Sequence, residues 1–130
     1  VHGNILPVLM PYCFNGLRRL EILNLSGIQI QTINQCSFCG MGRLLVLDLS
    51  ANKLQAIHDK TFAGAESLLH LNITRNHLKW VHSRTFKMLK NLFELSGDDE
   101  ELCCFWMFCR NRPISAIVCT PILSDGIKKQ

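Results

Sequence analysis

The sequence repeats itself every 24 residues without an insertion, and this period constrains the fold more than any other feature. Leucine fills two columns of the repeat, at Leu20, Leu44, Leu68 and Leu92 and at Leu23, Leu47, Leu71 and Leu95. Phenylalanine fills a third column, at Phe14, Phe38, Phe62 and Phe86. A fixed period of this length is typical of a stacked solenoid, in which each repeat is one structural unit.

The spacing within each unit, L-x-x-L-x-L-x-x-N-x-L, resembles that of leucine-rich repeats. The L-x-L segment alternates with period two and predicts a short strand. Each unit must return to the same side of the stack, so the strands should pair in parallel. We predict an α/β solenoid over 1–96, with a parallel concave β-sheet and short helical or irregular convex segments. Residues 97–130 are expected to form a cysteine-rich C-terminal cap or hinge.

Two columns predict what holds the units together. Asn52 and Asn76 follow the strands, where buried side-chain amides can satisfy backbone groups of neighbouring turns. Ile28 interrupts this column, so we expect local loosening there. The phenylalanine column should stack as a spine on the convex side.

The concave face is the default binding surface of a solenoid. Among its expected exposed positions, Asp48, His70 and Glu94 are charged or titratable, and we take them as candidate ligand-binding residues. A merely solvated polar face remains the alternative. At the strand edge, an apolar column is expected to pack under a flanking loop and consists of Leu45, Leu69 and Phe93.

Seven cysteines in 130 residues favour an oxidising compartment. The disulfide candidates are Cys13, Cys36, Cys39, Cys103, Cys104, Cys109 and Cys119. A Cys13–Cys36 bond between neighbouring units is plausible. Cys36-x-x-Cys39 is a weaker signal for a redox or zinc half-site, because it has no second cysteine pair and no βαβ context. An odd number leaves one cysteine free or paired outside the chain.

The other motifs predict binding rather than catalysis. Asn24-Leu25-Ser26 and Asn72-Ile73-Thr74 fit the N-glycosylation rule and make Asn24 and Asn72 candidate acceptors. His58 and His82 share a column, but two histidines alone are a poor metal site. No catalytic motif is present, so we predict a non-enzyme with no cofactor and no metal.

Charge and hydropathy bear on the partners. A net charge of +4, scattered along the chain, does not favour nucleic acid, and we expect no nucleic-acid partner. The apolar runs Leu102–Cys109 and Ile114–Cys119 are shorter than the roughly 18–20 residues of a membrane helix. Membrane attachment would therefore need segments outside this sequence. Because the sequence begins within a repeat, we expect the natural protein to continue upstream. The oligomeric state is left open.

The end of the repeats resembles the hinge of leucine-rich-repeat-containing G protein-coupled receptors, most closely the relaxin-receptor branch. The matching residues are the acidic run 95–102, the pair Cys103-Cys104, Cys119-Thr120-Pro121 and Asp125. The resemblance implies an extracellular ligand-recognition segment of a cell-surface receptor that binds a protein or peptide. It also implies that Cys119 pairs with Cys103 or Cys104. The alternative is a secreted or singly anchored leucine-rich-repeat module of the matrix or innate-immunity type.

Overall fold

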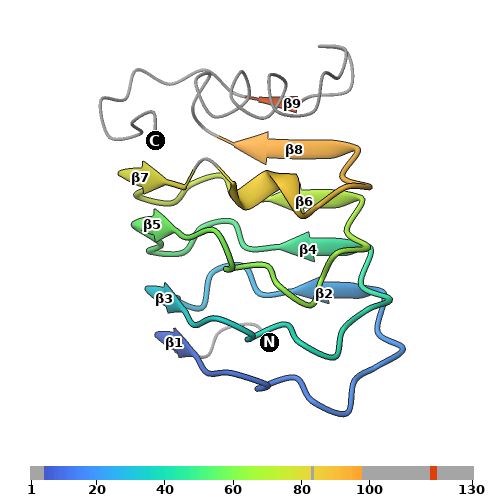
Figure 1. Cartoon of the computed structure of the whole chain (residues 1–130). Coiled ribbons are helices and arrows are strands. Elements are labelled where there is room, and N and C mark those ends of the chain that lie inside the picture. The colour runs from blue at the N-terminus through green and yellow to red at the C-terminus, as the bar shows by residue number, and fades with distance from the viewer. Residues whose placement is uncertain (1–4, 83, 98–117, 120–130) are drawn as a thin grey trace.

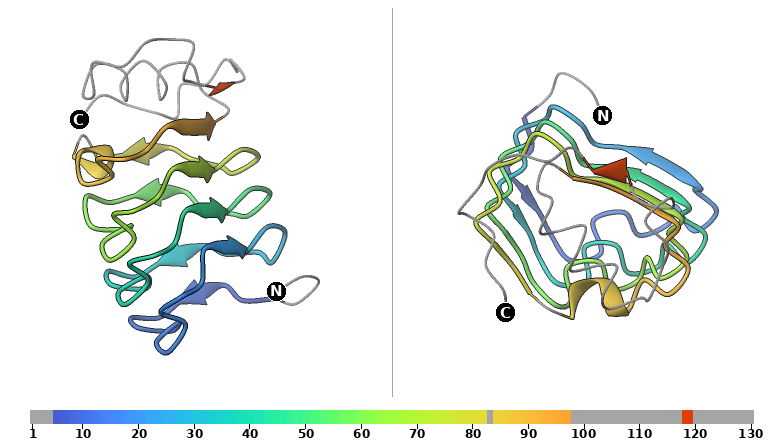
Figure 2. Two further views of the ribbon diagram at one scale, coloured as in Figure 1. Left: turned by 90° about the vertical axis from the view of Figure 1, so that its right-hand side faces the viewer. Right: turned by 90° about the horizontal axis from the view of Figure 1, so that it is seen from above.

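In a computed structural model of the chain, residues 5–82, 84–97 and 118–119 are described. Figure 1 shows successive coils stacked along one axis, each coil returning to the same side. Seen from above in Figure 2, the coils superimpose around a common interior. The predicted solenoid is therefore confirmed.

The concave face is one parallel sheet with the strand order β2-β4-β6-β8-β9. Its strands are β2 (Ile22–Asn24), β4 (Val46–Asp48), β6 (His70–Asn72), β8 (Glu94–Gly97) and β9 (Val118–Cys119). From β2 to β8 the register is one repeat per strand, since Leu23 pairs with Leu47, Leu47 with Leu71 and Leu71 with Leu95. The last strand, β9, pairs in parallel with the end of β8 and continues the sheet.

The opposite side of each coil carries shorter parallel pairs. The strands β1 (Val8–Leu9) and β3 (Thr32–Ile33) pair with each other, as do β5 (Ala56–Ile57) and β7 (Trp80–Val81). Turns connect these strands to the concave sheet. Within the described residues the only helical element is the short 3-10 helix η1 (Thr85–Lys87). The convex segments are thus irregular rather than α-helical, which is one of the two forms predicted for them.

The repeated apolar columns fill the interior. Leu44, Leu68 and Leu92 are fully buried, as are the leucines of the strand column from β4 onward. The phenylalanine spine is confirmed: the ring centroids of Phe14 and Phe38 lie 5.8 Å apart, and those of Phe38 and Phe62 lie 6.2 Å apart. Offset stacking of this kind adds to the stabilisation gained by burial alone.

Asn52 joins two coils through its buried side-chain amide. Its Oδ1 accepts hydrogen bonds from the backbone N–H groups of Ile28 at 3.1 Å and Ile30 at 3.0 Å. Its Nδ2 donates to the carbonyls of Leu25 and Leu49, both at 2.9 Å. A buried backbone group without a partner is costly, so this side chain fixes the turn of the preceding coil.

Ile28 occupies the position at which the next two coils have an asparagine. Its backbone carbonyl accepts the hydrogen bond that the asparagine side chain accepts in those coils. The N–H of Leu6 donates to the carbonyl of Ile28 at 2.8 Å, whereas the equivalent N–H groups of Ile30 and Leu54 donate to Oδ1 of the next asparagine. The Ile28 side chain is fully buried. The predicted loosening is not seen at this hydrogen bond, because the main chain supplies the acceptor.

Candidate functional site

His70 and Glu94 form a hydrogen-bonded pair on the concave face. They are paired residues of the neighbouring strands β6 and β8, and His70 Nδ1 lies 2.9 Å from Glu94 Oε1. The two side chains remain 41% and 39% exposed, so the pair stays open to a partner.

Asp48 lies on β4, one strand before His70. Its Oδ1 accepts a hydrogen bond from the backbone N–H of Ser50 at 2.9 Å, which holds the carboxylate at the end of the strand. Together with His70 and Glu94 it lines a shallow hollow of about 300 Å³ in the sheet. Val46, Leu47, Leu71, Asn72 and Ser96 complete the lining. The structure thus brings the three predicted binding residues to one hollow.

Phe93 adds an aromatic group at the edge of this hollow. Its ring meets the His70 ring edge to face, with centroids 6.2 Å apart, and the residue is 53% exposed. The expected packing of this apolar column under a loop is wrong at Phe93, although Leu45 and Leu69 are half-buried. The register of the repeat could have placed Phe93 beside His70, since position 94 pairs with position 70.

The two glycosylation candidates lie in the same column as Asp48. Asn24 on β2 and Asn72 on β6 are the paired residues of Asp48 on either side. The Oδ1 atom of Asn24 accepts from Ser26 N at 2.9 Å, and that of Asn72 accepts from Thr74 N at 3.0 Å. Both acceptors therefore sit on the concave face, in equivalent turns.

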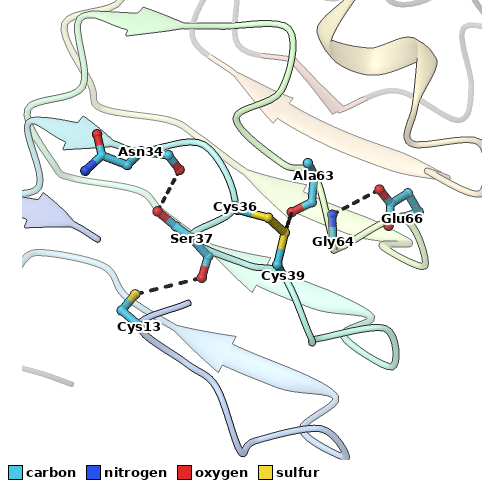
Figure 3. The surroundings of a disulfide bond; sticks show 8 residues. All are labelled: Cys13, Asn34, Cys36, Ser37, Cys39, Ala63, Gly64 and Glu66. Atoms are coloured by element: carbon cyan, nitrogen blue, oxygen red, sulfur yellow. Dashed lines mark hydrogen bonds between the residues drawn. A yellow bond between two sulfur atoms is a disulfide. The ribbon is translucent and has the colours of Figure 1, made fainter. Parts of the chain in front are cut away.

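Figure 3 shows a disulfide on a convex turn. Cys36 and Cys39 are bonded to each other, and their Cα atoms lie 4.7 Å apart. Gly64 on the next coil approaches the backbone of this turn so closely that a Cβ there would lie 2.4 Å from the Cα of Cys39. The disulfide therefore braces a turn that the neighbouring coil contacts directly.

Cys13 is a free thiol, so the predicted Cys13–Cys36 bond is wrong. Cys13 shares its column with Ser37, and its sulfur lies 3.8 Å from the Ser37 carbonyl oxygen on the next coil (Figure 3). Cys36 reaches Cys39 within its own turn instead. Cys13 is an exposed residue, but partial burial of its sulfur raises the pKa of the thiol above the ordinary value.

The remaining cysteine predictions fall at the end of the chain. Cys103, Cys104 and Cys109 lie outside the described residues. Cys119 belongs to β9, whose backbone pairs with β8.

The convex histidines are turn residues. The N–H of His58 donates to Thr61 Oγ1 at 2.8 Å, and His82 Nδ1 accepts from the N–H of Arg84 at 3.0 Å. Across residues 5–82 and 84–97, no cluster of three or more potential metal ligands occurs. The same part of the chain contains no helix with the length and hydropathy needed to cross a membrane.

A comparison with models of protein families identifies the family of the repeat. The model described as "Leucine rich repeat" matches residues 1–54 and 43–96, which together cover most of the chain. The chain belongs to the leucine-rich-repeat family. No curated protein matches it in sequence.

Two solved structures share the leucine-rich-repeat architecture. A chain of the TLR13–ssRNA13 complex is 25% identical over 89% of this chain, with a TM-score of 0.74. A chain of the Drosophila Toll–Spatzle complex is 22% identical over 74% of this chain, with a TM-score of 0.68, and supports the fold alone. This chain spans only 17% and 13% of their lengths. The likeness therefore concerns the fold of the repeats.

The comparison corrects the expectation of no nucleic-acid partner. The similar TLR13 structure is a complex with single-stranded RNA. A scattered net charge is thus no ground for excluding nucleic acid from a leucine-rich-repeat surface, because binding depends on local surface charge rather than on the sum.

Proposed function

We propose that this leucine-rich-repeat chain is an extracellular ligand-recognition segment and hinge of a cell-surface receptor. A protein or peptide ligand would bind the concave face at Asp48, His70 and Glu94. The observation that carries the proposal is their convergence on one open hollow, on a face whose side chains the core does not need. The likeness to TLR13 supports an extracellular placement.

The chemistry of the hollow suits a ligand that donates hydrogen bonds. Asp48 and Glu94 supply carboxylate oxygens, which accept charge-assisted hydrogen bonds. Phe93, half exposed beside His70, offers an apolar contact that desolvates such bonds. An apolar group beside a few fixed polar groups is the usual composition of a recognition site.

Among the described residues of the same hollow, no serine is connected to a histidine as in a catalytic site, which supports a non-enzyme. Glu94 orients His70, as in a catalytic pair, and Ser96 also lines the hollow. Within the described part of the chain, no hydrogen bond joins the Ser96 hydroxyl to His70. A nucleophile without a base in reach is not activated.

The receptor class we favour is the G protein-coupled one, with residues 1–96 as the recognition unit and 97–130 as the hinge. Support comes from the acidic run before Cys103-Cys104 and from the Cys119-Thr120-Pro121 segment. Ligand on the repeats would then alter how the hinge meets the membrane domain, which is a coupling between two sites. Seven apolar helices encoded after residue 130 would support this class.

The alternative is a secreted or singly anchored protein-interaction module of the matrix or innate-immunity type, which the likeness to TLR13 supports. A single membrane span or a stop codon after residue 130 would favour it and exclude the G protein-coupled class. The concave recognition site is common to both proposals, so it is tested separately.

A binding screen with matched variants tests the site. The chain would be displayed against secreted proteins and against single-stranded RNA as a separate arm. The combination Asp48→Asn, His70→Ala and Glu94→Gln should abolish binding of the ligand found. The control combination Asp59→Asn and Lys60→Ala on the convex turns should retain it. Loss in the control with retention in the concave variant would reject the proposed site, and binding of RNA alone would reject a protein ligand.

A further inference from the structure

Two glycosylation sequons flank one residue of the proposed site. Asn24 and Asn72 are the paired residues of Asp48, one from β2 and one from β6. Their positions in the hollow nevertheless differ. Asn72 is part of its lining, between Asp48 and Ser96, whereas Asn24 is not. A substituent on Asn72 would therefore cover the hollow, and one on Asn24 would cover only its Asp48 side.

The half-buried Asn72 side chain is held through its oxygen atom. Its Oδ1 accepts hydrogen bonds from Thr74 N at 3.0 Å and from Thr74 Oγ1 at 2.8 Å. Because the amide is planar, fixing Oδ1 in the turn directs Nδ2 away from it. Within the described residues Nδ2 makes no hydrogen bond. Nδ2 is the atom that carries an N-linked glycan, so attachment would disturb no contact of the fold.

We propose that Asn72 carries an N-linked glycan that closes the hollow, so that the glycan and a macromolecular ligand exclude each other there. The modification replaces one Nδ2 hydrogen by a bond to C1 of N-acetylglucosamine. The C1–O bond to the diphosphate of a lipid-linked oligosaccharide breaks, the lipid diphosphate leaves, and the amide proton passes to solvent. The exclusion of ligand rests on the proposed function, whereas the modification does not.

The exclusion follows from size and position. A branched oligosaccharide on Asn72 would stand over a hollow of about 300 Å³ and beside Glu94 and His70. Only the unmodified form would expose all three binding residues. The degree of modification at Asn72 would then set the fraction of receptor that can bind, a regulation of the site without any change in fold.

The modification is tested by secreting the chain from human cells and mapping it by mass spectrometry. Removal of glycan by peptide-N-glycosidase in H₂¹⁸O should convert Asn72 to ¹⁸O-labelled Asp. Thr74→Ala should abolish the label at Asn72, while Ser26→Ala should leave it unchanged. An Asn72 peptide recovered wholly unmodified from the secreted chain would overturn the proposal.

The exclusion is tested with a single-domain antibody as the probe. It is selected on the Thr74→Ala chain. Clones are kept if adding Glu94→Gln to that chain abolishes their binding. Such a clone should bind the glycosylated chain about tenfold or more weakly and recover after deglycosylation. Ser26→Ala should not restore binding. Equal affinity of the antibody for both forms would overturn the exclusion, whether or not a natural ligand is ever found. Failure to find a natural ligand would count against the proposed function alone.

Discussion

The convex spine and the concave sheet obey the same 24-residue period but use it differently. On the convex side one residue type recurs in every coil, as in the stack of Phe14, Phe38 and Phe62. On the concave side the column paired through the sheet changes from Ile22 and Val46 to His70 and Glu94. The core requires the first pattern, and nothing in the core requires the second. We therefore propose that the varying columns of this periodic protein are where recognition occurs.

Removal of one phenylalanine ring from the convex spine should cause the largest loss of stability. Phe62→Ala deletes a fully buried ring between neighbouring coils and should cost about 3–5 kcal/mol through lost burial and a residual cavity. Urea unfolding followed by circular dichroism measures the loss. Phe93→Ala is the matched control, because its ring is 53% exposed and its removal leaves no internal cavity. Equal losses in the two variants would show that the spine has no special structural role.

Removal of the Asn52 amide should have the next largest effect. Asn52→Ala leaves the N–H groups of Ile28 and Ile30 without their acceptor and should cost about 2–4 kcal/mol. Asn76→Ala should cost less, because Asn76 is only half-buried and water can reach its partners. Hydrogen exchange at Ile28 and Ile30 should accelerate in the first variant. Unchanged exchange there would contradict the assigned hydrogen bonds.

Removal of the disulfide should have a smaller effect. Cys36 and Cys39 are separated by only three positions, so the bond restricts little of the unfolded chain. The double variant Cys36→Ser and Cys39→Ser should lose about 2 kcal/mol on the chain-entropy model. Thermal unfolding of the double variant and of the unsubstituted chain provides the measurement. A collapse of the fold in the double variant would show that this disulfide, rather than the repeated columns, holds the coils together.

The smallest expected effect concerns the alkylation rate of the Cys13 thiol, and it is measured on the chain without any substitution. Because burial raises its pKa, less thiolate is present at neutral pH than in an unfolded chain. Alkylation by iodoacetamide should therefore be slower in the native chain and should accelerate as the pH rises. Mass spectrometry of the Cys13 peptide over a series of pH values checks this. A native rate equal to that in urea would contradict the raised pKa of the thiol.

The period alone predicted the parallel stack, because each position in a coil has one neighbour 24 residues away. The same logic failed for Cys13 and Cys36. It favours bonds between coils, whereas the turn brings Cys36 and Cys39 to a Cα separation of 4.7 Å. Backbone geometry inside a turn is not visible in the columns. The acceptor at Ile28 was missed for the same reason, since a carbonyl took over the role of a side chain.

The candidate site was predictable in its residues but not in its contacts. Asp48, His70 and Glu94 were placed on the concave face from their positions in the repeat. The His70–Glu94 hydrogen bond requires side-chain rotamers that the sequence does not specify, although the register makes the two residues neighbours. The exposure of Phe93 depends on what covers the sheet edge, which the period does not encode.

The central claim is that the concave residues recognise ligand without supporting the fold. It is tested most directly by measuring ligand affinity and melting temperature together in the variant with Asp48→Asn, His70→Ala and Glu94→Gln. Exposed ion pairs contribute at most about 1 kcal/mol, so the melting temperature should shift by only a few degrees while binding is lost. Retained affinity, or a fall in stability as large as that of Phe62→Ala, would contradict the account.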